Sequence, residues 1–219
     1  MDFLAYLTVA LAAYLLGSIP TGFLVAKGRG IDIRATGSGN IGATNVFRTL
    51  GKPAGVIVLL CDALKGVAAC LVVPWLALRL MGGGDAGTSP GLGLRMLAGL
   101  AAILGHNYTC WLRFKGGKGI ATSAGVLAVL MPAALGICLM VWLTVFAVSR
   151  YVSAASIAAS VALPFAVWGA IGSRPLTVLA AILGALAVYK HKANIRRLLD
   201  GTEHRFVRKT PDTNDIPNR

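Results

Sequence analysis

Charged side chains are scarce in this sequence, and their scarcity excludes a water-soluble globule. Only 13% of the 219 residues are charged, against about 25% in a typical soluble domain, whereas 56% are hydrophobic. With so few polar groups, the chain cannot cover the surface of a soluble fold of this size. The apolar residues form long runs instead of the alternating segments of about ten residues that a membrane barrel needs. We therefore expect an all-α polytopic membrane helix bundle.

Acidic residues are scarcer still, with 8 Asp and Glu against 21 Lys and Arg and a net charge of +13. Such an excess of basic over acidic residues can indicate nucleic-acid binding. Here, however, 17 of the 21 basic residues lie in four segments beside apolar runs, namely 27–52, 113–118, 150 and 190–219. Because Lys and Arg beside apolar runs set the orientation of membrane proteins, we expect membrane lipid as a partner and no nucleic acid.

The cysteines lack the spacing of a metal site or of a disulfide framework. Cys61, Cys70, Cys110 and Cys138 lie inside or at the edge of apolar stretches. We interpret them as small buried hydrophobic residues and predict no metal ligands among them.

The number of membrane crossings depends on how the chain behaves around Pro132. This proline divides the apolar residues 120–149, which as one helix would extend about 45 Å, beyond a hydrocarbon core of about 30 Å. One crossing there would put the basic segments on both sides of the membrane, whereas two short helices or a re-entrant hairpin put them all on one side. The positive-inside rule therefore favours seven transmembrane helices, with the amino terminus outside and the carboxyl terminus cytoplasmic. The seven runs are residues 3–26, 53–80, 94–112, 120–131, 133–149, 154–172 and 175–189.

The division into domains follows from the same pattern. We expect residues 1–200 to form a single integral membrane domain. Residues 201–219 are polar and basic, and we expect a partly disordered cytoplasmic tail that contacts phospholipid. The first apolar run has no basic region before it, so we interpret it as a retained span and not as a cleaved signal.

The polar segment 27–52 has the composition of an anion-binding loop. Gly37, Gly39 and Gly42 have the G-x-G-x-x-G spacing of a dinucleotide fold, but they lie between two expected spans, without the strand that such a fold requires. Their physical effect still applies, because glycines let several backbone N–H groups converge on an anion. The alternative is a glycine-rich turn whose arginines contact lipid headgroups. Nearby side chains add donors and positive charge that suit a phosphate: Arg34, Ser38, Asn40, Thr44, Asn45 and Arg48.

A second candidate phosphate site precedes the fourth expected helix. Lys115 and Lys118 flank Gly116 and Gly117, which imitates a P-loop, although the residue after Lys118 is not the Ser or Thr of that motif. Two ammonium groups on a flexible hinge at a helix start suit a phosphate, and the alternative is a positive-inside anchor. His106, at the end of the preceding span, is a further candidate for this site or a hydrogen-bonding group at headgroup level.

Five further polar residues lie inside a span or at helix ends. Asp62 and Lys65 are three apart on one helical face and can form an ion pair, either to hold the second helix in register or to serve the function. Ser153 follows a tight turn, where a packing role is the alternative. His191 and Asn194 share a face at the end of the last helix, where a solvated histidine is the alternative.

Taken in order, these segments resemble the bacterial acyl-phosphate:glycerol-3-phosphate acyltransferase family, known as PlsY, along nearly the whole chain. The resemblance rests on GSIPTGFLVAK leading into GSGNIGATNVFR, then DALKG, GHNYTCWLRFKGGKGIAT, YVS and HKANIRRL. It implies a multi-pass enzyme of seven helices in the bacterial inner membrane, with its active site at the cytoplasmic face. It also implies that no metal or organic cofactor is needed.

The reaction implied by this resemblance moves a fatty acyl group from acyl phosphate to the sn-1 hydroxyl of glycerol 3-phosphate. The product is lysophosphatidic acid for phospholipid biosynthesis, and docking of the enzyme that makes acyl phosphate is a further candidate contact. Six residues match positions that line the family's substrate site and are the predicted catalytic residues: Ser38, Arg48, Lys118, Ser153, His191 and Asn194. The predicted substrate- and phosphate-binding residues are Gly37, Gly39, Asn40, Thr44, Asn45, His106, Lys115, Gly116 and Gly117.

Two other functions compete with the acyltransferase. A transporter of a phosphorylated metabolite predicts basic residues at the membrane midplane, whereas here only Lys65 lies there. A lipid-binding scaffold without turnover would not need His191 and Asn194 beside the basic segments. Acyltransferases that rely on a His followed five positions later by Asp are excluded, because none of the three histidines has Asp at that offset.

The charge pattern predicts that residues 27–52, 113–118 and 150–153 all face the cytoplasm together with the tail. A cysteine introduced at Ala193, in a variant without the native cysteines, is expected to react with a membrane-impermeant maleimide only in inverted vesicles. Labelling of this position from the periplasmic side would contradict the seven-helix arrangement.

Overall fold

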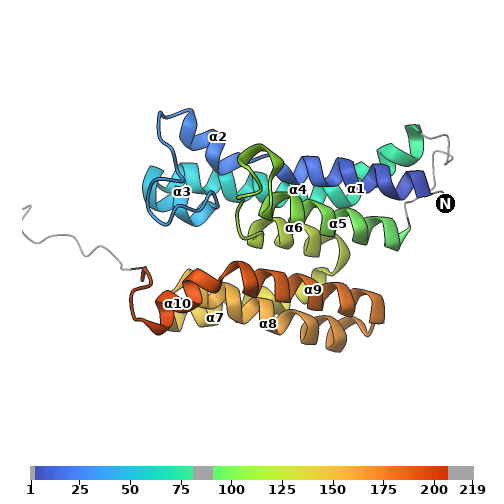
Figure 1. The fold of residues 1–219 in the computed structure, drawn as a ribbon. Coiled ribbons are helices and arrows are strands. Elements are labelled where there is room, and N and C mark those ends of the chain that lie inside the picture. The colour runs from blue at the N-terminus through green and yellow to red at the C-terminus, as the bar shows by residue number, and fades with distance from the viewer. Residues whose placement is uncertain (1–2, 81–90, 207–219) are drawn as a thin grey trace, which may run out of the picture.

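The structure of the chain, a computed structural model, describes residues 3–80 and 91–206, and every regular element in these ranges is helical (Figure 1). This confirms the all-α prediction for the described residues. The first elements are α1 (Phe3–Ser18), α2 (Thr21–Lys27), α3 (Ala43–Leu50), α4 (Lys52–Leu80), α5 (Leu92–Asn107) and the short 3-10 helix η1 (Cys110–Leu112). They are followed by α6 (Ile120–Leu130), α7 (Pro132–Ser149), α8 (Val152–Ile171), α9 (Arg174–Lys190) and α10 (Lys192–Leu199).

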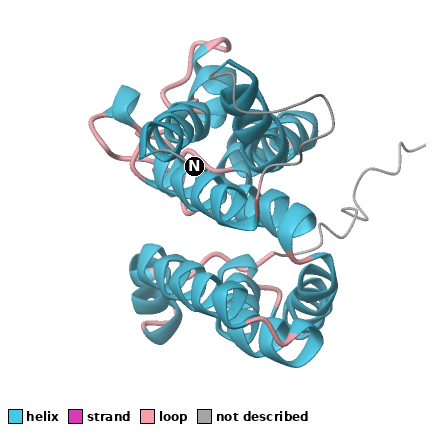
Figure 2. Cartoon of the chain, turned by 90° about the vertical axis from the view of Figure 1, so that its right-hand side faces the viewer, coloured by secondary structure: helices cyan, strands magenta, loops and turns pink. Residues whose placement is uncertain are grey.

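The helices form two layers, which Figure 1 shows one above the other and Figure 2 shows after a quarter turn. In the first layer α1 packs against α5 and α4, and α4 packs against α6. In the second layer α8 packs against both α7 and α9. The chain passes from the first layer to the second between α6 and α7. A site between the layers therefore combines residues that are far apart in the sequence.

The break predicted at Pro132 is confirmed. α6 ends at Leu130, Met131 departs from helical geometry with φ −148° and ψ 57°, and Pro132 begins α7. Proline suits this position because its missing N–H would have no partner in the first helical turn. The 11 residues of α6 extend only about 16 Å, roughly half of a hydrocarbon core of about 30 Å.

Helices overlap all seven predicted apolar runs, but fewer of them are long enough to cross a membrane alone. Within the described ranges, four segments are long and apolar enough: Phe3–Lys27, Lys52–Leu80, Pro132–Ser149 and Val152–Ile171. A fifth is obtained if α9 and α10, which are bent by 56° relative to each other, count as one span. Seven crossings and the orientation of the termini therefore remain predictions.

Two segments are more regular than the sequence analysis predicts. The polar segment 27–52 contains α3, an eight-residue helix that carries Asn45 and Arg48. Residues 201–206, here called the strap, fold back onto the bundle, although they belong to the predicted tail. Residues 207–219 of that tail lie outside the described ranges. The segment with α3 and the strap beside α10 lie at one end of the bundle, here called the loop end (Figure 1).

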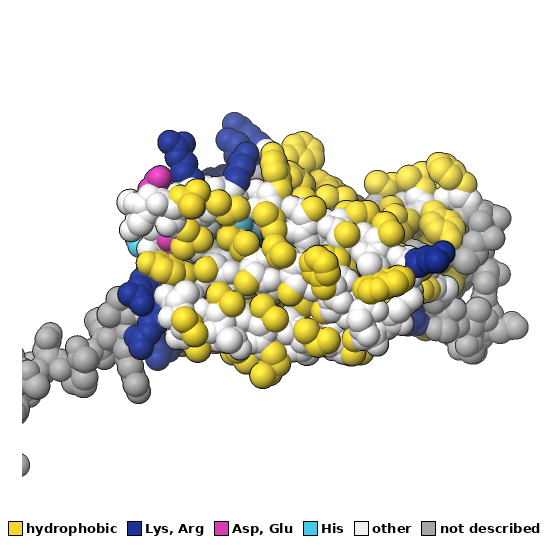
Figure 3. Space-filling model, turned by 90° about the horizontal axis from the view of Figure 1, so that it is seen from below, with side chains coloured by type: hydrophobic (Ala, Val, Ile, Leu, Met, Phe, Trp, Pro, Cys, Tyr) yellow, Lys and Arg dark blue, Asp and Glu magenta, His cyan; other side chains and the backbone are white. Residues whose placement is uncertain are grey.

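The surface of the bundle is apolar in its middle and basic at the loop end. Figure 3 shows hydrophobic side chains over the central part and Lys and Arg gathered toward the loop end, with a smaller group at the opposite end. Leu64, Met140 and Phe165 are 62%, 64% and 74% exposed. Large apolar side chains exposed in such number suit contact with lipid chains.

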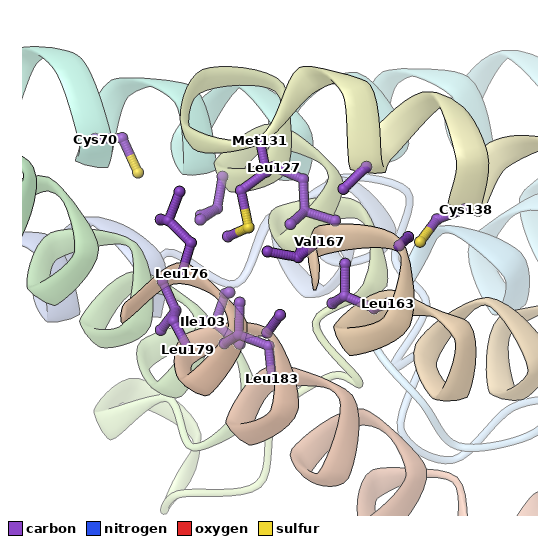
Figure 4. Close-up of a cluster of buried hydrophobic side chains, with 14 residues drawn as sticks. Cys70, Ile103, Leu127, Met131, Cys138, Leu163, Val167, Leu176, Leu179 and Leu183 are labelled. Carbon is purple, nitrogen blue, oxygen red and sulfur yellow. The ribbon is translucent and has the colours of Figure 1, made fainter. Parts of the chain in front are cut away.

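A hydrophobic core joins the two layers, and Figure 4 shows its side chains. Leu127 of α6 and Met131 cluster there with Val167 of α8 and with leucines of α9. Small residues bring helices of the first layer together, because a Cβ at Gly66 of α4 would overlap the backbone of α6. Close approach through glycine is typical of helix packing in membranes.

The ion pair predicted between Asp62 and Lys65 is confirmed, and it is part of a larger cluster. The Lys65 Nζ lies 3.0 Å from the Asp62 Oδ1, 2.9 Å from the His106 Nδ1, and 3.1 Å from the Ile19 carbonyl oxygen to which it donates. An ammonium group has three donors, so all three of its hydrogens have an acceptor nearby. The cluster ties α4 to α5 and to the end of α1, which supports the structural interpretation of the pair.

Lys65→Met is expected to lower the free energy of unfolding by about 3–5 kcal/mol, because it leaves the buried Asp62 carboxylate without its cation. Asp62→Leu in the same chain should recover most of that loss, because no buried charge then remains. Lys52→Met, at the exposed start of the same helix, is the control and should leave stability unchanged. Thermal and denaturant unfolding in detergent micelles would measure these effects, and equal stability of both Lys→Met variants would contradict the role of the cluster.

Candidate active site

A cavity of about 400 Å³ lies between the two layers. This volume is within the range of about 300–1,000 Å³ that is usual for small-molecule sites. Its lining is polar at the loop end, where residues of α3, α8 and α10 and those before α6 meet. Deeper in the bundle the lining is apolar and includes Leu127, Leu135, Leu163 and Leu183. The cavity therefore offers a polar region and an apolar region to a single ligand.

A chain of hydrogen bonds organises the polar region. The Lys118 Nζ donates to the Asn194 Oδ1 at 2.5 Å, and the Asn194 Nδ2 donates to Glu203 at 2.8 Å. The Glu203 carboxylate also accepts from the Ser153 hydroxyl at 2.9 Å and from the Arg197 Nε at 2.7 Å. Ser153 lies in the first turn of α8, Asn194 belongs to α10 and Lys118 precedes α6, so this chain of bonds spans both layers.

Glu203 is ionised in this setting. Burial raises its pKa, but the hydrogen bonds from Asn194, Arg197 and Ser153 outweigh that effect, and its pKa lies below the ordinary value. An ionised carboxylate only accepts hydrogen bonds, so the hydroxyl of Ser153 and the amide of Asn194 must be the donors. The orientation of both side chains is therefore determined by Glu203.

His191 is 2% exposed and lies between α9 and α10. Its Nδ1 is 2.7 Å from the Ala187 carbonyl oxygen. A carbonyl can only accept, so the ring carries its proton on Nδ1 and keeps a lone pair on Nε2. Burial and the nearby charge of Lys118 lower the pKa of His191 to about 4, so the ring is neutral at pH 7.

Two cations line the polar region. Lys118 is partly buried, and burial lowers the pKa of its ammonium group to about 8, although the Glu203 carboxylate acts in the opposite direction. Arg48 is exposed, and its guanidinium donates to the His204 carbonyl at 3.4 Å. The Glu203 carboxylate acts on both cations, but it is also paired with Arg197. The polar region therefore keeps positive charge for an anion.

The glycine-rich turn before α3 is held by Asn45. The Asn45 Nδ2 donates to the carbonyls of Ile33, Thr36 and Asn40 at 3.3, 3.0 and 2.9 Å. Its Oδ1 accepts from the Ser38 N–H at 2.9 Å. Because this amide uses its donors and its acceptor on the backbone of the turn, Asn45 shapes the cavity wall.

Comparison with known proteins decides what kind of site this is. A family model described as "Glycerol-3-phosphate acyltransferase" matches residues 7–201. The chain belongs to the glycerol-3-phosphate acyltransferase family. It is 46% identical over 201 residues to the glycerol-3-phosphate acyltransferase of Geobacter sulfurreducens, covering 91% of this chain and 97% of that protein. It is 49% identical over 210 residues to that of Desulforudis audaxviator, covering 94% and 98%.

Two crystal structures of PlsY (YgiH), an integral membrane glycerol 3-phosphate acyltransferase, resemble the fold as well. The glycerol 3-phosphate form has a TM-score of 0.80 at 42% identity, over 92% of this chain and 96% of that chain. The lysophosphatidic acid form has a TM-score of 0.78 at 42% identity, over 92% and 95%. This chain is accordingly an acyltransferase of phospholipid biosynthesis with several apolar helices suited to a membrane.

The acyltransferase fold brings all six predicted catalytic residues to the cavity. Four of the predicted binding residues also line it: Asn40, Thr44, Asn45 and His106. His106 is engaged by Lys65 through its Nδ1, which makes it part of the buried cluster as well as of the cavity wall. The roles of these residues in turnover remain predictions. The six predicted catalytic residues that meet here are Ser38, Arg48, Lys118, Ser153, His191 and Asn194.

The other five predicted binding residues do not line the cavity. Lys115 is exposed outside it, so the two ammonium groups expected to act together are separated. The N–H groups of Gly116 and Gly117 donate to the carbonyls of Asn107 and His106, at 3.2 and 3.0 Å, and are not free for a phosphate.

Gly37 and Gly39 have φ values of +60° and +69°, which glycine adopts without strain, so both residues shape the turn. The Gly39 N–H is taken by the Thr36 carbonyl at 3.1 Å. Arg34, expected to supply charge for a phosphate, forms an ion pair with Asp32 at 2.7 Å. The convergence of free N–H groups predicted for this turn therefore does not occur at Gly39.

Glu203 is the functional residue that the sequence analysis missed. The polar and basic composition of residues 201–219 predicts a tail, and a residue of a tail is not expected in the site. One signal could have found it, because Glu203 is the only glutamate in the sequence and stands within a strongly basic segment. An isolated acid among arginines near a helix end is often paired.

Proposed function

We propose that this acyltransferase uses acyl phosphate as its donor and acylates the sn-1 hydroxyl of glycerol 3-phosphate, giving lysophosphatidic acid. The observation that carries the proposal is the graded cavity, which is polar and cationic at the loop end and apolar toward its interior. Both the donor and the product have a phosphate next to an acyl chain, and such a ligand matches this gradient. The related PlsY structures, with glycerol 3-phosphate and with lysophosphatidic acid, support the proposed acceptor and product.

Arg48 and Lys118 are the residues proposed to bind the substrate phosphates. Both line the cavity, and each carries a charged donor that gives strong hydrogen bonds to a phosphate oxygen. Lys118 forms one hydrogen bond within the described residues, to Asn194, and an ammonium group has two further donors. The bond to Asn194 directs the ammonium group, while the remaining donors are available to a ligand.

In the proposed reaction the glycerol hydroxyl attacks the acyl carbon, and the bond from that carbon to the phosphate oxygen breaks. The hydroxyl proton passes to the departing phosphate, which carries basic oxygens beside the reacting carbon. His191 then has a positioning role, because its Nε2 lone pair can accept a hydrogen bond from the second free hydroxyl of glycerol 3-phosphate, which leaves the proton of the attacking hydroxyl for the phosphate. Lys118 stabilises the negative charge that develops on the carbonyl oxygen and on the phosphate.

Two of the predicted catalytic residues have hydrogen-bond partners within the protein. The Ser153 hydroxyl donates to Glu203 at 2.9 Å. Asn194 connects Lys118 to Glu203, and the Ala187 carbonyl orients the His191 ring. In the proposed mechanism both residues therefore hold the Lys118 side of the site in place.

We place the enzyme in the bacterial inner membrane, with this site at the cytoplasmic face. The basic residues gathered at the loop end support that orientation through the positive-inside rule (Figure 3). Arg48 and Lys118 lie at this same end, where water-soluble glycerol 3-phosphate would have access.

The donor is tested by giving purified protein glycerol 3-phosphate with either acyl phosphate or acyl-CoA and measuring lysophosphatidic acid by mass spectrometry. We expect product when acyl phosphate is the donor and none when acyl-CoA is the donor. NMR should place the ester of the product at sn-1. Arg48→Ala should lower the apparent affinity for substrate about tenfold or more, since loss of a charged hydrogen bond costs about 1.5–3 kcal/mol. Lys115→Ala, outside the cavity, is its control. Product formed only with acyl-CoA would refute the donor assignment.

The proton path is tested by the pH dependence of kcat/KM. As pH rises through about 8, Lys118 loses its charge and activity should fall. Lys118→Arg should move this alkaline limb to higher pH, because a guanidinium does not deprotonate there. His191→Gln should reduce turnover but keep both limbs, the acidic one arising from the substrate phosphate with its pKa of about 6. Loss of the acidic limb with a rate fall of about 10³ or more would make His191 the general base.

A further inference from the structure

The strap crosses the loop end of the bundle and is fixed at both ends. At its start the N–H groups of Thr202 and Glu203 donate to the Arg197 carbonyl, at 2.8 and 3.1 Å. At its far end the Phe206 N–H donates to the Arg150 carbonyl at 2.9 Å. Arg150 lies in the turn between α7 and α8, so the strap runs from α10 to the start of α8.

The Phe206 side chain lies between the two layers. Its ring centroid is 5.7 Å from that of Phe47 in α3 and 5.8 Å from that of Phe146 in α7, with interplanar angles of 52° and 75°. Tilted and edge-on arrangements at these distances are the favourable ones for aromatic pairs. Phe146 stacks in turn on Trp142, which lines the cavity. Phe206 thus joins the first layer to the second beside the cavity.

The same ring also contacts a residue of the site. The Arg48 guanidinium lies 5.6 Å from the centre of the Phe206 ring, within the range of a cation–π contact. Arg48 also donates to the backbone carbonyl of His204, another residue of the strap. Since Arg48 is exposed and its side chain is long, these two contacts restrict where its charge lies.

The position of the strap decides which partners Glu203 can reach. Arg197 and Asn194 lie six and nine residues before Glu203 and would stay near it wherever the strap ran. Ser153 is 50 residues away, at the start of α8 beside the Arg150 turn. The contact of Glu203 with Ser153 therefore depends on the path of the strap toward that turn, where the Phe206 N–H is bonded to the Arg150 carbonyl.

We propose that Phe206 is a positioning residue for acyl transfer. By packing between Phe47 and Phe146 it holds the strap across the loop end, so that Glu203 engages Ser153 and the Arg48 guanidinium faces the cavity. It acts only through these residues and does not touch substrate itself. The inference rests on the roles proposed above for Arg48 and for the Lys118–Asn194–Glu203 chain.

The first test compares steady-state kinetics of full-length Phe206→Ala, Phe206→Tyr and wild-type protein in detergent micelles. We expect Phe206→Ala to raise the KM for glycerol 3-phosphate about tenfold or more, because the phosphate-binding cations lose their support. Phe206→Tyr keeps the ring and should stay near wild type. The matched control is Phe114→Ala, an aromatic that is 63% exposed and does not line the cavity.

A double-mutant cycle separates positioning from a general loss of stability. If Phe206 acts through Arg48, the rise in KM for the double variant Phe206→Ala/Arg48→Ala should be smaller than the product of the rises in the two single variants. The same is expected for the double variant Phe206→Ala/Glu203→Gln. The Arg48 cycle stands by itself if Glu203→Gln does not fold. Unchanged KM in Phe206→Ala, failure of Phe206→Tyr to restore it, or losses that multiply independently in the Arg48 cycle would overturn the inference.

The assay also keeps this inference apart from the donor assignment. Wild-type protein is first assayed with acyl phosphate and with acyl-CoA, and the variants are then compared with the donor that supports turnover. Turnover only with acyl-CoA as donor would refute acyl phosphate as the donor, and the Phe206 variants could still be compared with acyl-CoA. Normal use of acyl phosphate by a Phe206→Ala protein with wild-type kinetics would refute only the positioning role.

Discussion

The Glu203 carboxylate is the group on which the loop end of the bundle depends. It accepts hydrogen bonds from Ser153 of α8 and from Asn194 and Arg197 of α10. Asn194 in turn accepts a hydrogen bond from Lys118, which precedes α6. One carboxylate thus links the strap, the second layer and the first layer. In a poorly hydrated site such charged hydrogen bonds are strong, and loss of one partner leaves a buried polar group unpaired.

The two buried polar clusters differ in how completely they are satisfied. The Lys65 ammonium has an acceptor near each of its three hydrogens, so this lysine has no donor left for a ligand and serves to tie helices together. Lys118 forms one hydrogen bond within the described residues and lies at the cavity. The difference explains why one lysine of the bundle suits a structural role and the other suits phosphate binding.

The arrangement of the layers turns these local features into a site for an amphiphile. α6 is too short to cross a membrane, and its break at Pro132 sends the chain into the second layer. The cavity between the layers consequently receives Lys118 from one side and Ser153, His191 and Asn194 from the other. Leucines of the same helices line its interior, so polar and apolar substrate parts would bind in one continuous space.

The sequence by itself determined the helical class, the break at Pro132 and the Asp62–Lys65 pair, because each depends on composition or on spacing within one helix. The motifs and their order were also enough to select six residues that all line the cavity. Only the tertiary structure decided that Glu203 joins them, since its contact with Ser153 spans 50 residues. The tertiary structure also decided that the N–H groups of Gly116 and Gly117 donate to carbonyls at the end of α5. The sequence does not show which carbonyl a backbone N–H of a loop will reach, because that depends on how the loop folds against the helix.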